Sequence, residues 1–291
     1  MLNVYEQVSI NKTRSVIVIA LFITFVLGVS YLITYTLDLD PSIIMGAFIF
    51  STFSAIGSYF FGDKIVLGLN GAREAQRKEF FNYYTVTENL SLASQIPVPK
   101  MYVIDSPALN AFATGRDPQH AVICVTTGLL EKLSRTQLEG VIAHELSHVV
   151  NYDIRLMMLV SILVGSLSIL SDLLLRGHAR SRNRNRSSGM LALVGFILIL
   201  FSPLIAQLIQ LALSRQREFL ADASGVKLTR QPSGLIEALT IIATDPNHLQ
   251  NAAPSTAPLF ISNPFKGQTI ATLFSTHPPI EQRIATLQKM L

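Results

Sequence analysis

The stretch from Ser134 to Val150 reads SRTQLEGVIAHELSHVV, and it determines the fold that we expect around it. Gln137 follows Ser134 by three residues, which is the capping-box pattern that begins an α-helix. His144 and His148 are then one turn apart on a single helix face, where both imidazoles can reach one metal ion. Glu145 lies beside that face and can take a proton from a water molecule held there. The pattern H-E-x-x-H therefore predicts a zinc site rather than a helix with two ordinary histidines.

A catalytic zinc site needs a third protein ligand and leaves one position for water. Among the downstream acidic residues, Glu218 stands out because Asp222 follows it at i+4 on the same helix face. One carboxylate can bind the metal while the other orients a ligand histidine. The alternative for Glu218 is a surface ion pair with Arg215 or Arg217. We predict one zinc ion per chain, with three ligands: His144, His148 and Glu218.

The chain upstream of this helix predicts one more helix and then short strands. Arg73 to Gln95 has helix-like spacing. Met101 to Ile104 and Ala121 to Val125 are rich in β-forming residues, and Asn110 to Thr114 lies between them as another extended segment. Cys124, the single cysteine, is expected to be a buried core thiol.

The composition is that of a membrane protein, with 49% hydrophobic residues, 14% charged residues and a mean hydropathy of +0.42. Two uninterrupted apolar runs, Ser15 to Leu37 and Pro41 to Phe61, are each long enough to cross a hydrocarbon core of ~30 Å. Two later runs, Leu156 to Leu175 and Met190 to Leu213, are less uniform. We therefore expect about four transmembrane helices, the first of them a retained anchor rather than a cleaved signal peptide.

These features predict an α+β fold in which a multi-pass α-helical membrane region is joined to a zincin-like metalloprotease domain with a short sheet. The expected parts are a transmembrane hairpin (1–62), the first part of the protease domain (63–155), a second transmembrane hairpin (156–213) and the second part of the domain (214–291). If the H-E-x-x-H helix continues without a break into the second hairpin, His148 lies about 10 Å from Arg155, close to the membrane surface.

The charges predict which side of the membrane the domain occupies. Basic residues flank the first hairpin and acidic residues occupy its turn: Lys12, Arg14, Lys64, Arg73, Arg77 and Lys78 are the basic ones, and Asp38 and Asp40 the acidic ones. The positive-inside rule then places the N-terminus and the domain in the cytoplasm. The arginine-rich loop at 176–186 conflicts with a spanning second hairpin, so either this loop violates the rule or the hairpin enters the membrane without crossing it. No aromatic or motif context accompanies the basic residues, so we expect no nucleic-acid partner.

Four motifs together resemble the HtpX-type membrane zinc endopeptidases, relatives of the CaaX prenyl proteases. They are HELSH at 144–148 with Asn151 and Asp153 after it, REFLAD at 217–222, NAFATG at 110–115 and STHPP at 275–279. The resemblance implies that Glu145 is the catalytic base, that Asp222 and Asn151 support the metal-binding histidines, and that the chain is a bacterial inner-membrane protease. It also implies a quality-control or stress-response role with misfolded membrane proteins as substrates, and no small-molecule cofactor.

The sequence leaves more than one interpretation open for a possible substrate-binding strand and for a late histidine. The resemblance favours an edge strand that binds a substrate chain by strand addition, formed by Asn110, Ala111, Phe112 and Ala113. The alternative is an ordinary strand end with Phe112 in the core. His277 is a structural residue, stabilises the oxyanion of the transition state or occupies the open metal position.

Two other functions remain open on the sequence. One is a CaaX-type processing protease that acts on lipidated proteins. The other is a membrane scaffold or chaperone with a purely structural zinc ion, although such a site does not need Glu145.

Overall fold

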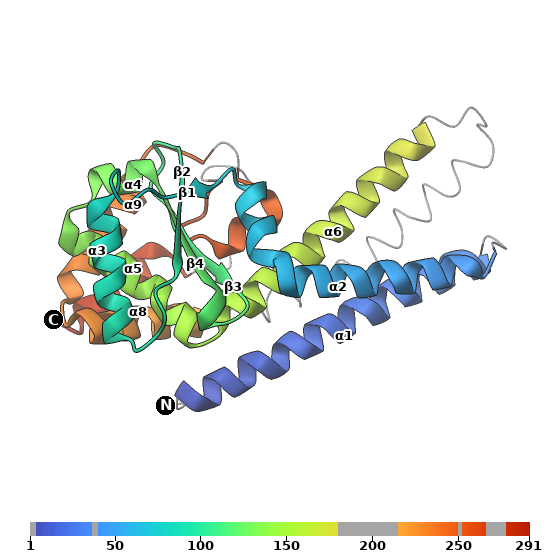
Figure 1. Ribbon diagram of the computed structural model, residues 1–291, viewed down its shortest axis with the longest axis horizontal. Coiled ribbons are helices and arrows are strands. Elements are labelled where there is room, and N and C mark those ends of the chain that lie inside the picture. The colour runs from blue at the N-terminus through green and yellow to red at the C-terminus, as the bar shows by residue number, and fades with distance from the viewer. Residues whose placement is uncertain (1–3, 37–39, 180–214, 250–251, 266–277) are drawn as a thin grey trace.

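The computed structural model describes residues 4–36, 40–179, 215–249, 252–265 and 278–291. Figure 1 shows two parts: a rounded domain in which helices surround a small sheet, and a set of long helices that projects from one side of it. The projecting helices are α1 (Val4–Thr36), α2 (Ser42–Leu69) and α6 (Asp153–Ala179).

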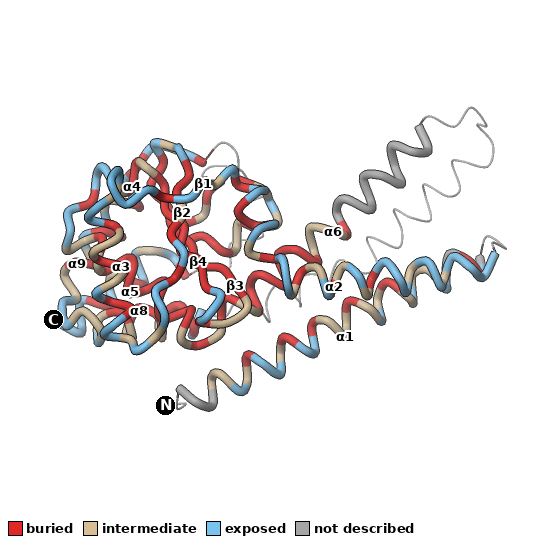
Figure 2. Tube along the Cα trace, in the orientation of Figure 1, coloured by how far each residue is buried: buried red, intermediate tan, exposed pale blue. Residues whose placement is uncertain are grey.

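Helices α1 and α2 carry the predicted first membrane hairpin. Their segments Gln7–Leu32 and Ser42–Leu69 are long and apolar enough to cross a membrane. Among the described residues the number of such helices is two, or three if the helix at Arg135–Val150 and the start of α6 form one bent span. Figure 2 shows exposed residues along both helices, and on α2 they include large apolar side chains such as Phe53 and Phe61. Residues 180–213 of the predicted second hairpin lie outside the described ranges, so four spans remain a prediction.

The sheet has four strands: β1 (Arg73–Glu74), β2 (Lys100–Ile104), β3 (Ala111–Gly115) and β4 (Ala121–Thr126). Their order in the sheet is β1-β2-β4-β3, so β3 forms one edge. Strands β2 and β4 are parallel, whereas β1 and β3 pair antiparallel with their neighbours. Cys124 is buried within β4, as expected.

The helix predicted over Arg73 to Gln95 is wrong in its first part. Arg73 pairs with Val103 as part of β1, and the helix α3 extends only over Phe81–Ala93. The guanidinium of Arg73 donates hydrogen bonds to Asp105 and Glu79, which hold this segment in an extended conformation beside β2.

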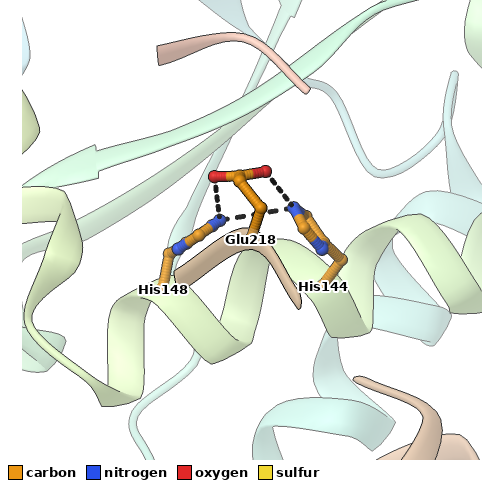
Figure 3. A group of neighbouring side chains, drawn as sticks. All are labelled: His144, His148 and Glu218. Atoms are coloured by element: carbon orange, nitrogen blue, oxygen red, sulfur yellow. Dashed lines mark hydrogen bonds and ion pairs between the residues drawn. The ribbon is translucent and has the colours of Figure 1, made fainter. Parts of the chain in front are cut away.

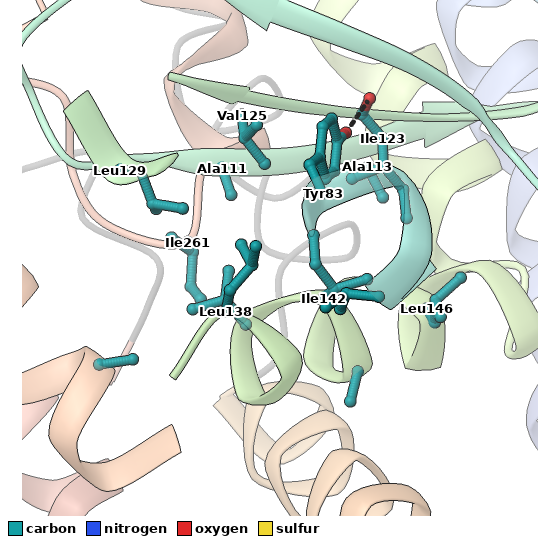
Figure 4. Packing of buried hydrophobic residues seen from close by; sticks show 14 of the residues in the cluster. Tyr83, Ala111, Ala113, Ile123, Val125, Leu129, Leu138, Ile142, Leu146 and Ile261 are labelled. Carbon is teal, nitrogen blue, oxygen red and sulfur yellow. Dashed lines mark hydrogen bonds between the residues drawn. The ribbon is translucent and has the colours of Figure 1, made fainter. Parts of the chain in front are cut away.

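Helix α5 (Arg135–Val150) begins with the predicted capping box, because Ser134 and Gln137 exchange side-chain and backbone hydrogen bonds. One face of α5 packs against the sheet, and Figure 4 shows Leu138, Ile142 and Leu146 pointing into this core. The remaining elements are η1 (Pro118–His120), α4 (Thr127–Lys132), α8 (Arg215–Thr229), α9 (Pro232–Thr244), η2 (Pro254–Leu259) and α11 (Ile280–Gln288).

The continuous helix expected from His148 to Arg155 is also wrong. Helix α5 ends at Val150, Tyr152 has a φ of 61°, and α6 begins at Asp153. The axes of α5 and of the first part of α6 differ by 83°. Asp153 is thereby brought back beside the last turn of α5, which has consequences for the metal centre.

Candidate metal centre

His144, His148 and Glu218 converge at one buried point, as Figure 3 shows. The Nε2 atoms of His144 and His148 are 3.3 Å apart. Glu218 places Oε2 3.7 Å from Nε2 of His144 and Oε1 3.6 Å from Nε2 of His148. A tetrahedral zinc ion with bonds of about 2.1 Å has ligand atoms about 3.4 Å apart. The spacing of these three side chains therefore fits zinc.

Two helices supply these ligands, and their close approach depends on a glycine. The histidines lie on α5, whereas Glu218 lies in the first turn of α8. A Cβ on Gly225 of α8 would lie 3.1 Å from the backbone nitrogen of His144, so a larger residue would press the helices apart. Glu218 is only 4% exposed, so it is not part of a surface ion pair.

Each histidine has a carboxylate beside its other ring nitrogen. Nδ1 of His144 lies 2.9 Å from Oδ1 of Asp222, and Nδ1 of His148 lies 3.1 Å from Oδ2 of Asp153. When Nδ1 donates its proton to the carboxylate, Nε2 keeps a free electron pair for a metal. Both imidazoles are thus oriented toward Glu218.

An arginine holds each of these carboxylates. Arg283 of α11 donates to Asp222 from Nη2 at 2.6 Å and from Nε at 2.9 Å. Arg217 Nη1 donates to Asp153 Oδ1 at 3.3 Å. Arg283 is fully buried, and it also donates to the carbonyl of Ile261 at 3.3 Å. The centre therefore draws on elements from distant parts of the chain.

The two histidines differ in their affinity for protons. Burial and the positive charge of Arg283 lower the pKa of His144 to about 4, although Asp222 favours the charged form. Burial opposes a charge on His148 as well, but the hydrogen bond with Asp153 and the charge of Glu218 outweigh it and raise the pKa of His148 to about 9. A metal ion binds neutral imidazoles, so it must displace the proton from His148.

Glu145 follows His144 on α5 and is buried at 2% exposure. Its negative charge contributes to the raised pKa of His148. The Glu145 carboxylate is therefore one of the buried negative charges that act on His148.

Sequence reasoning anticipated only part of the surroundings of the histidines. Asp222 was expected to orient a histidine, and it contacts His144. Asp153 appeared only within a motif, although it makes the equivalent contact with His148. Asn151 is the C-cap residue that follows α5, and its backbone carbonyl accepts a hydrogen bond from Asn11. The signal for Asp153 was its place just beyond the last turn of the H-E-x-x-H helix.

The predicted substrate strand lies at the sheet edge, but the chain itself covers part of that edge. Ile261 donates its backbone N–H to the carbonyl of Ala111 at 2.9 Å. Asn110 donates from Nδ2 to the carbonyl of Ser262 at 2.8 Å. Phe112 is fully buried and packs edge-on against Phe260. Substrate binding by this strand, which includes Ala113, remains a prediction; His277 lies outside the described residues.

A buried His-His-Glu cluster with a glutamate inside an H-E-x-x-H helix defines a metallopeptidase. The model of a known family, Peptidase family M48, matches residues 78–291. The chain therefore belongs to peptidase family M48, and the prediction of a metalloprotease is confirmed.

Relatives of nearly the same length match almost the whole chain. The Protease HtpX homolog of Dictyoglomus turgidum is 42% identical over 287 residues, with 98% of this chain and 94% of the relative covered. The Protease HtpX homolog of Streptococcus uberis is 37% identical over 295 residues, with 98% and 99% covered. The predicted resemblance to the HtpX type is thereby confirmed. The crystal structure of S. mikatae Ste24p matches at 20% identity and a TM-score of 0.49, covering 93% of this chain and 61% of that chain.

Proposed function

We propose that the protein is a membrane-anchored zinc endopeptidase that binds one zinc ion through His144, His148 and Glu218. The observation that carries the proposal is the spacing of the ligand atoms, 3.3 to 3.7 Å, at the distances expected for the corners of a zinc tetrahedron. Asp222 and Asp153 each fix one histidine ring. Partners of this kind fix the ring orientation of a ligand histidine and strengthen metal binding.

When bound, zinc supplies Lewis acidity, which polarises a scissile carbonyl and makes a water molecule more acidic. Glu145 accepts the proton of the attacking water on its carboxylate. The same carboxyl group then returns the proton to the leaving amine, so no covalent intermediate with the enzyme is required. Asp222 and Asp153 hold the imidazoles in place during these steps.

The proposed substrates are polypeptides, in particular misfolded or damaged membrane proteins, and the proposed setting is the bacterial inner membrane. Support comes from aromatic and basic side chains gathered where the long helices meet the domain. Arg155 lies over the rings of Tyr59 and Tyr152, and Arg116 lies over Phe60. Aromatic residues with basic neighbours are typical of the membrane surface. Such a surface next to the domain supports contact with a membrane, and the four spans, the cytoplasmic protease domain and the quality-control role are proposed from the sequence and its family resemblance.

The test uses the full chain in lipid nanodiscs with a loosely folded soluble protein as substrate. We expect zinc-dependent cleavage at internal peptide bonds, measured by mass spectrometry, which stops on chelation and in Glu145→Gln. Cleavage confined to prenylated C-terminal peptides would point instead to a CaaX-type processing protease. A protein that retains stoichiometric zinc and cuts neither substrate would be a scaffold with a structural metal ion.

A further inference from the structure

The first membrane helix contributes a side chain to the surroundings of the metal centre. Asn11 lies on α1, before most of the apolar span, and is buried at 1% exposure. Its Nδ2 donates to Oδ1 of Asp153 at 2.7 Å and to the backbone carbonyl of Asn151 at 2.9 Å. Both acceptors lie at the sharp bend between α5 and α6. Asn11 therefore connects the membrane anchor to the corner that follows the H-E-x-x-H helix.

The same carboxylate reaches the metal ligands through its other oxygen. Oδ2 of Asp153 lies 3.1 Å from Nδ1 of His148, while Oδ1 accepts hydrogen bonds from Asn11 and Arg217. Two donors on Oδ1 determine the rotation of the carboxylate, and this rotation determines where Oδ2 lies. A carboxylate held in this way fixes the ring orientation of the histidine that it contacts.

Packing along α1 fixes the position of Asn11. Val18, Phe22 and Val26 of α1 are buried against α6, next to Leu156 and Val160. The ammonium group of Lys12 lies 4.6 Å from the centre of the Tyr152 ring at the bend. Because α1 is an apolar helix long enough to cross a membrane, its packing on α6 links the orientation of Asp153 to the placement of the anchor.

We propose that Asn11 is a positioning residue of the metal centre, acting on His148 through Asp153, so that α1 is part of the site as well as an anchor. This inference rests on the proposed metal-binding role of His148. The competing explanation is that Asn11 only stabilises the bend between α5 and α6. In that case its loss lowers the stability of the fold without changing the affinity for zinc.

The experiment compares variants of the full chain in nanodiscs by competition for zinc with a chromogenic chelator. Removal of a residue that supports a ligand histidine costs roughly 10-fold to 100-fold in metal affinity, and we expect this loss for Asp153→Asn. Asn11→Ala, one contact further away, should weaken binding by roughly 3-fold to 10-fold. Ser15→Ala is the matched control, because Ser15 is also buried on α1 but donates to the carbonyl of Asn11 within the helix. It should bind zinc as the unaltered protein does.

Double variants separate a positioning role from a structural one. Asn11→Ala should add little to Asp153→Asn, because both changes act on His148 along one path. When combined with Asp222→Asn, which acts on His144, Asn11→Ala should weaken zinc binding by the same factor as it does alone. If Asn11→Ala does not fold, Asn11→Gln displaces the same amide and is tested in its place.

Two results have different meanings. Unchanged zinc affinity in the Asn11 variant, with lost binding in His148→Ala, would overturn this inference alone. Full zinc binding by His148→Ala would overturn the proposed metal site itself.

Discussion

Asp222 and Arg283 form a completely buried ion pair beside the metal centre, with Nη2 of Arg283 2.6 Å from Oδ1 of Asp222. The pair joins α8 to α11 and at the same time places Asp222 against Nδ1 of His144. The guanidinium therefore links α11 to His144, one of the proposed metal ligands.

Replacement of Arg283 by methionine should destabilise the protein. The change keeps the volume of the side chain but leaves Asp222 as a buried charge without its main partner, which costs about 3 to 5 kcal/mol. Thermal unfolding of the metal-free protein measures this loss. Arg135→Met is the control, because the Arg135 side chain is 48% exposed in its pair with Glu139, and exposed pairs contribute about 1 kcal/mol or less. Equal losses of stability in the two variants would show that the buried pair contributes no more to folding than an exposed pair.

Glu145→Gln should retain zinc and lose peptidase activity. The amide occupies the same space but cannot accept the proton of the attacking water, and general-base catalysis typically contributes about 10²-fold to 10⁴-fold. The measurement combines zinc content with the rate of substrate cleavage. Undiminished cleavage by the pure variant would exclude Glu145 as the base.

Glu218→Ala should lose zinc, because it removes one of three protein ligands. Glu237→Ala and Glu281→Ala are matched controls: Glu237 accepts a hydrogen bond from Gln137 on the exposed side of α5, and Glu281 is an exposed residue in the first turn of α11. Metal analysis after gel filtration should give full zinc content for both controls. Loss of zinc in a control, with retention in Glu218→Ala, would assign the third ligand elsewhere.

Zinc affinity should fall as the pH is lowered. Between pH of about 4 and about 9 the metal-free centre carries a proton on His148 and none on His144, so zinc binding releases one proton. The dissociation constant should therefore rise about tenfold for each unit by which the pH falls within this window. Above the pKa of His148 the dependence should disappear.

Chelator competition at a series of pH values measures this slope. Asp153→Asn removes a carboxylate that raises the pKa of His148, so the upper end of the window should move to lower pH. An affinity independent of pH around neutrality would contradict the assignment of the proton to His148.

Local patterns in the sequence predicted that His144, His148 and Glu218 lie together. The capping box at Ser134 and the spacing of His144 and His148 are short-range signals, and helix geometry turns them directly into positions in space. The same holds for Glu218 and Asp222, which occupy one face of α8. Strands β2 and β4 were likewise marked by runs of β-forming residues.

Tertiary contacts could not be predicted in this way. Arg283 and Asn11 reach the centre only after distant helices have packed, and neither has a local pattern that distinguishes it from a surface residue. The break at Tyr152 was missed because no glycine or proline marks it in the sequence. Arg73 pairs with Val103, which lies in a strand much later in the chain. The residues next to Arg73 give no signal of this partner, so their spacing was interpreted as a helix.

The dispersal of the centre over the chain has a consequence for biosynthesis. The two histidines leave the ribosome well before Glu218, and Arg283 follows only after α8 and α9 have been made. A nascent chain that ends before α11 therefore lacks the guanidinium that holds Asp222 against His144. The surroundings of His144 are therefore complete only after α11 has been made.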